Sequence, residues 1–184
     1  SERLLSLGHE VVGVDRFSDY YPRSYKEANL VRLRDEPRFA LEVHDLAECA
    51  MEPLLEGIEV VFHQAAQAGV RASWGQSFET YLRDNLLSTQ RLLEAVRGHK
   101  SVRKVVYASS SSVYGEAHEL PMRETSATLP YSPYGVTKLA ADLTRIVNSG
   151  KGEAALYGDF ERLLVSYGDM PAVAASVLGP PWRS

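Results

Sequence analysis

Three runs of apolar, largely β-branched residues divide the chain at regular intervals. They cover residues 10–14 (EVVGV), 58–65 (IEVVFHQA) and 103–110 (RKVVYASS), and a weaker run covers 38–43 (RFALEV). Runs that lack hydrophobic–polar alternation are typical of strands buried on both faces, as in a parallel sheet. The pattern therefore predicts four short parallel strands.

Apolar residues at helical spacing fill the intervals between these runs. Residues 25–36 form an amphipathic stretch that Pro37 should end, and residues 77–98 keep the helical spacing as far as Gly98. A further helix ends at Gly8, ahead of the first strand. Strands that alternate with helices over short links predict an α/β fold with a doubly wound parallel sheet.

Composition and charge exclude several classes of protein. The 184 residues are 45% hydrophobic, enough for a buried core, and the net charge of -4 comes without a basic cluster, which argues against a nucleic acid partner. The single cysteine, Cys49, excludes a disulfide framework and a multi-cysteine zinc site and favours a cytoplasmic location. The chain has no run of about 18 apolar residues, so we expect no membrane span.

Two aspartates lie at predicted strand ends and are candidate ligands for a dinucleotide. Asp15 ends the first run, where an acidic residue can accept hydrogen bonds from ribose hydroxyls and disfavour the extra phosphate of NADP. The neighbouring Arg16 weakens that preference, and an aspartate that simply faces water explains the position equally well. Asp45, with Leu46 beside it, could contact adenine, although an N-cap for the next helix is the simpler interpretation.

Small and polar residues follow the third strand. Residues 63–71 (HQAAQAGVR) place Gln64, Ala65 and Ala66 where a flat cofactor could pass close to the backbone. A tightly packed sheet edge explains the same small residues. Arg71 could contact a phosphate or a carboxylate, or lie on the surface.

Four consecutive serines, residues 109–112, end the last strand. Hydroxyl groups at the carboxyl end of a parallel strand face the ligand crevice of such folds. A serine nucleophile would need a G-x-S-x-G turn, which this segment lacks. Hydrogen bonding of Ser110, Ser111 and Ser112 to a substrate oxygen is therefore favoured over a plain polar loop.

Tyr134 and Lys138 stand four residues apart in a segment that predicts a helix start (SPYGVTKLAAD, residues 132–142). That spacing places both side chains on one helix face. An adjacent ammonium group favours the phenolate and lowers a tyrosine pKa, and such a tyrosine can act as a general base or acid on a hydroxyl group. Such pairs are common on helix surfaces, but the place of this one after a serine-rich strand end makes it specific.

Together these segments resemble the extended short-chain dehydrogenase/reductase family, and within it the NAD-dependent nucleotide-sugar epimerases and dehydratases. The resemblance covers residues 2–148 and includes GHEVVGVDRFSDYY, HQAAQAGVR, DNLLSTQRLLEAV, VVYASSSSVYGE and SPYGVTKLAAD. The first three segments look most like UDP-glucuronate or UDP-galacturonate 4-epimerases. The resemblance implies a Rossmann-like NAD-binding domain over residues 1–148.

The resemblance also implies roles for individual residues. Tyr134 would be the acid/base, Lys138 its activating partner, and Ser110 would bond the sugar 4-hydroxyl. Asn85 would steady the site from its helix. The residues implied to contact NAD are Asp15, Asp45, Leu46, Gln64, Ala65, Ala66, Asn85, Tyr134 and Lys138.

The implied reaction inverts C4 of a UDP-hexuronate or UDP-hexose through a transient 4-keto sugar, with NAD regenerated. Arg71, Ser111 and Ser112 would face this substrate. Related dehydratases carry an acidic pair after the catalytic hydroxyl, and UDP-glucuronate decarboxylases keep a glutamate nearby, whereas serines cannot serve as carboxylate bases. A nucleotide-sugar reductase and a non-catalytic Rossmann-like binding domain are the alternatives. Helices at 77–87 and 133–146 would suit a homodimer.

Both ends depart from the family pattern. The glycine-rich pyrophosphate loop and the strand ahead of it are not in this sequence, so we expect a chain truncated within its first helix. Residues 1–184 alone should then bind NAD weakly or not at all. Residues 149–184 do not match the family's sugar-nucleotide domain and form an unassigned tail, with a short helix expected around 159–168.

Overall fold

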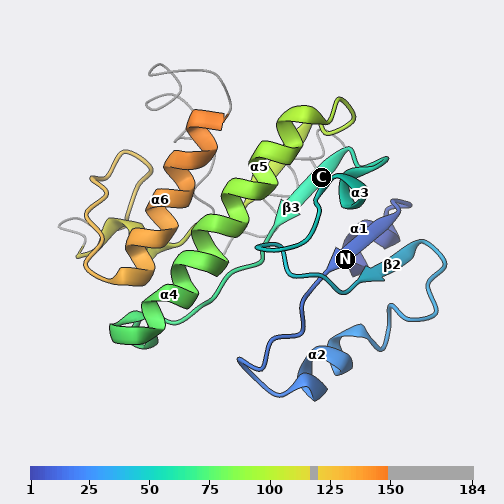
Figure 1. Ribbon diagram of the computed structural model, residues 1–184, viewed down its shortest axis with the longest axis horizontal. Coiled ribbons are helices and arrows are strands. Elements are labelled where there is room, and N and C mark those ends of the chain that lie inside the picture. Colours follow the sequence, from blue (N-terminus) through green and yellow to red (C-terminus); the bar gives the residue numbers. More distant parts are fainter. Residues whose placement is uncertain (117–119, 149–184) are drawn as a thin grey trace. The chain divides into compact units, whose positions relative to one another are not determined.

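The computed structural model describes residues 1–116 and 120–148. The chain divides into two compact units, Ser1–Cys49 and Ala50–Ser184, and Figure 1 colours both along the sequence. The tail and the helix expected around residues 159–168 lie outside the described residues. A single NAD-binding domain over residues 1–148 stays a prediction.

The first unit contains a pair of parallel strands and two short helices. Its elements in chain order are α1 (Glu2–Ser6), β1 (Val11–Val14), α2 (Arg23–Leu30) and β2 (Phe39–Glu42). β1 and β2 pair in parallel, with Val11 opposite Phe39. Two predicted strands are thus confirmed, each slightly shorter than its apolar run.

The helices of this unit end differently. Gly8 has a φ of 91°, and the N–H groups of Gly8 and His9 donate to the carbonyl oxygens of Leu5 and Leu4 at 3.0 and 3.2 Å. These two bonds form a Schellman motif, which only a left-handed residue such as glycine allows at low cost. α1 therefore ends where Gly8 predicts.

α2 ends at Leu30, earlier than the predicted end at Pro37. The N–H of Leu33 donates to the Leu30 carbonyl, three residues back, at 2.8 Å. The chain thus tightens into turns within the amphipathic stretch, so Pro37 is not what ends this helix.

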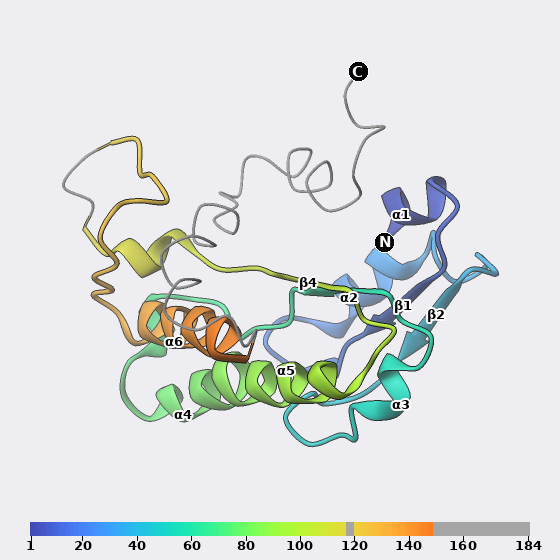
Figure 2. The same cartoon turned by 90° about the horizontal axis from the view of Figure 1, so that it is seen from above.

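The second unit contains another parallel pair and the longest described helices. Its elements in chain order are α3 (Glu52–Leu55), β3 (Val60–His63), η1 (Arg71–Ser73), η2 (Gly75–Ser77), α4 (Phe78–Tyr81), η3 (Leu82–Leu87), α5 (Ser88–Gly98), β4 (Lys104–Tyr107), η4 (Ser111–Tyr114) and α6 (Pro133–Asn148). β3 and β4 pair in parallel, from Val60 opposite Lys104 to His63 opposite Tyr107. α5 and α6 pack side by side, as Figures 1 and 2 both show.

The helix predicted over residues 77–98 is present but has an irregular middle. α4 continues through η3, a π-helical segment that contains Asn85, into α5. π segments are rare and frequently occur at functional sites. Gly98 is the last helical residue, but the chain leaves through an extended His99 (φ -96°, ψ 112°), so no left-handed glycine ends this helix.

The predicted single sheet is present, among the described residues, as two parallel pairs, one in each unit. In the second unit pairing stops at His63 and Tyr107, so residues 64–65 and 108–110 belong to loops and not to strands. Because parallel strands end at the same edge, these two loops emerge from one edge of the pair. None of the described helices has the length and apolar character needed to cross a bilayer.

Candidate active site

α6 carries the tyrosine–lysine pair, and serine hydroxyls hold its first turn. Ser132 Oγ accepts from the N–H of Gly135 at 3.1 Å, and Ser73 Oγ accepts from the N–H of Tyr134 at 3.0 Å. These bonds satisfy N–H groups that have no partner within the helix. Tyr134 thus stands in the first turn, and Lys138 follows one turn later on the same face.

Lys138 is buried against the end of β4, with 3% of its surface exposed. Its Nζ donates to the carbonyl oxygen of Ala108 at 2.8 Å and lies 4.8 Å above the centre of the Tyr107 ring. Burial lowers the pKa of the Lys138 ammonium to about 8, and the charge of Asp142 opposes that change. The ammonium therefore stays largely protonated at pH 7.

Tyr134 is half-buried beside a second tyrosine. Its ring meets the Tyr81 ring edge-on, with 6.1 Å between the ring centres. The Tyr81 hydroxyl lies 2.8 Å from the carbonyl oxygens of both Ala68 and Gly69. Tyr81 therefore connects Tyr134 to the loop that follows β3.

The predicted substrate serines begin three residues beyond β4, next to the start of α6. Ser110 Oγ accepts from the N–H of Ser112 at 3.2 Å and so caps η4; this bond does not use the hydroxyl hydrogen of Ser110. Ser111 is exposed and Ser112 half-buried. A Cβ added to Gly135 would lie 2.5 Å from the Ser112 carbonyl oxygen. The structure thus brings these serines and the first turn of α6 together.

Asn85 ties the loop after β3 to α6. Its side chain accepts from the N–H of Gln67 at 2.7 Å and donates to the Gln67 carbonyl at 3.1 Å and to Thr137 Oγ1 at 3.0 Å. Only 1% of Asn85 is exposed. Since these bonds engage the amide on both sides, Asn85 acts on the site through the loop and the helix.

His63, the last residue of β3, is buried in the same network. Its Nε2 lies 2.8 Å from Thr89 Oγ1, and that hydroxyl donates to the Asn85 carbonyl at 2.6 Å. A hydroxyl has one hydrogen to donate, so His63 must be the donor to Thr89. Burial, and then the charge of Lys138, lower the pKa of His63 to about 4, which leaves the imidazole neutral at pH 7.

The other predicted contact residues of this unit are exposed. Gln64, Ala65 and Ala66 follow β3 in an irregular loop, and Arg71 begins η1. The two small side chains leave the backbone of this loop open to a ligand. Among the described residues, no hydrogen bond or ion pair joins Arg71 to Ser110, Ser111 or Ser112.

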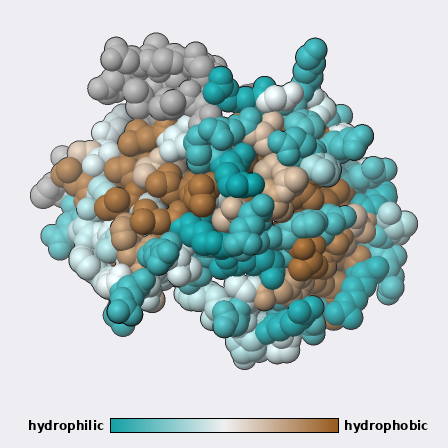
Figure 3. Space-filling view, in the orientation of Figure 1, coloured by the Kyte–Doolittle hydropathy of each residue, from teal (hydrophilic) through white to brown (hydrophobic). Residues whose placement is uncertain are grey.

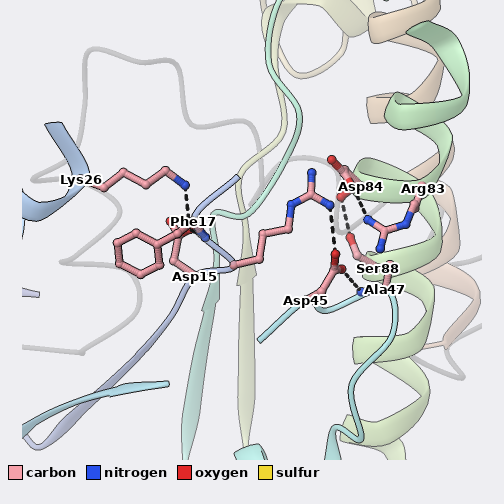
Figure 4. Close-up of polar contacts among 9 residues, drawn as sticks. Asp15, Phe17, Lys26, Asp45, Ala47, Arg83, Asp84 and Ser88 are labelled. Carbon is pink, nitrogen blue, oxygen red and sulfur yellow. Dashed lines mark hydrogen bonds and ion pairs between the residues drawn. The ribbon is translucent and has the colours of Figure 1, made fainter. Parts of the chain in front are cut away.

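In the first unit, Asp15 lies directly after β1 and binds a lysine (Figure 4). Its Oδ1 accepts from Lys26 Nζ at 2.7 Å and from the N–H of Phe17 at 2.6 Å. Both contacts use Oδ1, and the side chain is 42% exposed, so Oδ2 can still accept from a ribose hydroxyl. A carboxylate oxygen that can accept in this way fits the adenosine end of a dinucleotide.

Asp45 and Leu46 follow β2 in the same unit. Asp45 Oδ2 pairs with Arg16 Nη1 at 3.0 Å, and its Oδ1 accepts from the N–H of Ala47 at 2.9 Å. Asp45 therefore caps a turn over residues 46–48, and the interpretation as an N-cap of the next helix is wrong, because that helix starts only at Glu52. Leu46 is half-buried.

Sequence reasoning missed several contributors, among them Lys26, Tyr81, Thr137 and Asp142. Three of them offered no usable signal, because their partners lie far away in the sequence. Asp142 alone offered one, since it follows Lys138 by one helical turn on the same face.

Comparisons with known proteins identify the family of this chain. A protein-family model described as GDP-mannose 4,6 dehydratase matches residues 1–153. YtcB of Bacillus subtilis, an uncharacterized UDP-glucose epimerase, is 45% identical over 141 residues, which are 77% of this chain and 44% of YtcB. UDP-glucuronate 4-epimerase 3 of Arabidopsis thaliana is 36% identical over 146 residues, 77% of this chain and 34% of that protein.

A solved structure of a UDP-sugar epimerase also matches this chain. UDP-glucuronic acid 4-epimerase from Bacillus cereus, in complex with UDP-glucuronic acid and NAD, matches with a TM-score of 0.77 and 37% identity, over 82% of this chain and 48% of that one. The chain thus spans less than half the length of these relatives, and the match confirms an α/β Rossmann-like fold. Since the family model covers most of its residues, the chain belongs to the GDP-mannose 4,6-dehydratase family of NAD-dependent nucleotide-sugar epimerases and dehydratases.

Proposed function

We propose that this protein inverts C4 of a UDP-sugar with NAD as cofactor. The observation that carries the proposal is the position of α6. It places Tyr134 one turn from the buried Lys138 and fixes Lys138 to the strand end that leads to Ser110. The names of two relatives support a UDP-sugar as the substrate class, since both relatives are named as UDP-sugar epimerases.

In this proposal Tyr134 and Ser110 act on the sugar 4-hydroxyl. Ser110 orients that hydroxyl, and Tyr134 Oη removes its proton and later returns it. Lys138 holds a positive charge one turn from Tyr134, which favours the phenolate. NAD, when bound, would supply the hydride acceptor and donor for oxidation of C4 to a ketone and for its reduction on the opposite face.

The remaining roles concern binding. Asp15, Asp45 and Leu46 contact the adenosine end of NAD, and Gln64, Ala65 and Ala66 line its middle. Lys138 and Tyr134 also contact the cofactor. Asn85 contributes by holding the loop at Gln67 and the helix at Thr137, a role its buried amide supports. Arg71, Ser111 and Ser112 face the substrate.

Epimerisation is favoured over dehydration, although the family includes both. A dehydratase must move a second proton with a carboxylate, and the positions after Ser110 hold Ser111 and Ser112. These hydroxyls cannot act as bases near neutral pH. The UDP-glucuronate epimerases among the relatives favour a hexuronate substrate.

Product analysis tests the proposal. The polypeptide as its gene encodes it would be incubated with NAD and UDP-glucuronate, and in parallel with UDP-glucose, while proton NMR follows the sugar H4 signal. We expect the C4 epimer of one substrate without net formation of NADH. Accumulation of NADH with an oxidised sugar would favour the reductase class instead. NAD binding without any turnover would favour a binding domain.

We also propose a homodimer and a cytoplasmic location. Leu82, Leu87, Val136 and Leu143 are exposed on η3 and α6, which pack together, and apolar surface covers α6 in Figure 3. Burial of such a face favours association of two copies. Sedimentation should show a dimer, and Leu143→Glu should shift it towards the monomer.

The proposed cytoplasmic location rests on the single cysteine, which suits a reducing compartment.

A further inference from the structure

α6 holds the loop after β4 at two successive residues. Lys138 Nζ donates to the Ala108 carbonyl at 2.8 Å, and Ser109 Oγ donates to Asp142 Oδ2 at 2.6 Å. Ala108 and Ser109 immediately precede Ser110. The backbone that presents Ser110 is therefore anchored by two side chains that stand one turn apart on one helix.

Asp142 is buried, with 5% of its surface exposed. The charged and titratable groups that interact with it are Lys138 and Arg145 on α6, Tyr107 on β4 and Tyr114 on η4. An isolated buried carboxylate is costly, so its hydrogen bond and nearby cations are needed to keep it ionised.

The titration of the two groups is compatible with a charged pair. Burial raises the pKa of Asp142 to about 6, and the Ser109 hydrogen bond, Arg145 and Lys138 oppose this. With the pKa of Lys138 lowered to about 8, both side chains are mostly ionised at pH 7. His63 on β3, which is neutral at pH 7, also interacts with Lys138.

We propose that Asp142 is a positioning residue of the Tyr134–Lys138 site. Its carboxylate anchors Ser109, and with it the backbone of Ser110, and supplies the negative charge that stabilises the Lys138 ammonium. The inference rests on the proposed function for the roles of Ser110 and Lys138, but the electrostatic part can be measured without turnover.

The titration of Lys138 tests that part. In protein with isotope-labelled lysine side chains, Asp142→Asn should lower the pKa of Lys138 by about one pH unit, because the opposing charge is removed. Asp19→Asn, at an exposed aspartate of the first unit, should leave it unchanged. An unchanged Lys138 titration in Asp142→Asn would overturn the proposal, since a purely structural role would not move it.

A reciprocal variant covers the case in which Asp142→Asn does not fold. Lys138→Met keeps the apolar stem and removes the charge, so the pKa of the Asp142 carboxyl should rise by an amount similar to the change in the first experiment. Carboxyl-labelled aspartate would report this value. A pKa of Asp142 that stays the same would contradict the proposal equally well.

Ser109→Ala tests the anchor, because it removes the hydrogen bond to Asp142 without replacing either Asp142 or Lys138. It should lower kcat by about tenfold through misplacement of Ser110, while the exposed Ser101→Ala should not. Full activity of Ser109→Ala would overturn the anchoring role. If the unaltered protein does not epimerise UDP-sugars, the proposed function fails, and the two titrations still decide the role of Asp142.

Discussion

The two units contain the same element, a pair of parallel strands, but they stabilise their polar groups in different ways. In the first unit, α2 has no fully buried residue, and the ion pairs of Asp15 and Asp45 are partly exposed. In the second unit, His63, Asn85 and Asp142 are each at most 5% exposed and hydrogen-bonded. Exposed ion pairs contribute little and are screened by salt, whereas breaking a buried hydrogen bond is costly. Substitutions should therefore matter most in the second unit.

The largest effect should come from Tyr134→Phe. In the polypeptide as its gene encodes it, this variant keeps the ring that meets Tyr81 but removes the acid/base hydroxyl. Epimerisation should therefore fall by at least about 100-fold, while the Kd for NAD should change little. The rate of product formation and an NAD titration measure the two effects. Tyr25→Phe, at an exposed tyrosine of the first unit, is the matched control and should retain full activity. Retained activity in Tyr134→Phe would show that another group moves the proton.

Gly135→Ala should destabilise the second unit by roughly 2–3 kcal/mol. The added Cβ would lie 2.5 Å from the Ser112 carbonyl oxygen and 3.0 Å from Pro130 Cβ, so helix or loop must move. Gly98→Ala is the matched control, since nothing lies within 4 Å of its added Cβ, and it should stabilise the helix by up to about 1 kcal/mol. Urea denaturation measures both. Equal midpoints for the two variants would mean that α6 does not approach the serine loop this closely.

The sequence predicted the elements better than their ends and partners. Apolar runs identified all four strands of the described residues, although no residue of β1 or β2 is fully buried. The residues that follow His63 and Tyr107 are small or polar and still resemble strand ends, and only the pairing shows where each strand stops. Asn85, within the π segment, bonds to Gln67 and Thr137, and no local pattern reveals these long-range partners.

In the candidate site, too, the spacing of residues within a helix was predictable from the sequence, whereas their burial was not. The four-residue spacing placed Tyr134 and Lys138 on one face, because that is a property of any helix. Charged and polar residues on a helix ordinarily predict a solvent-exposed face, yet Thr137, Lys138 and Asp142 are buried. Tertiary packing on the end of β4 decides this, and it cannot be read from α6 alone.

Acidification should change the free energy of unfolding of the second unit through two groups that act in opposite directions. The folded pKa of His63, about 4, is below the ordinary value, so its contribution to stability is lost as the pH falls from about 6.5 to 4. The folded pKa of Asp142, about 6, is above the ordinary value, so its contribution grows as the pH falls from 6 towards 4. Each amounts to about 2 kcal/mol at pH 4.5.

Single variants separate these contributions. Relative to the unaltered protein, His63→Leu should gain about 2 kcal/mol of unfolding free energy between pH 7.5 and 4.5, and Asp142→Asn should lose a similar amount. Urea denaturation at both pH values measures the differences. Parallel pH profiles for all three proteins would mean that neither group is buried as described.

The smallest effect should come from the ion pair of the first unit. Lys26 partly neutralises Asp15, so Lys26→Gln should let the carboxylate repel the 2′-phosphate of NADP more strongly. The ratio of the Kd for NADP to that for NAD should rise roughly threefold, the size expected of a partly exposed ion pair, and the change should shrink at high salt. Arg32→Gln removes the same charge at a side chain that is 81% exposed and should leave the ratio unchanged. A rise well above tenfold would mean that Lys26 binds the phosphate directly, and the first unit would then hold its ligand by contact as closely as the second.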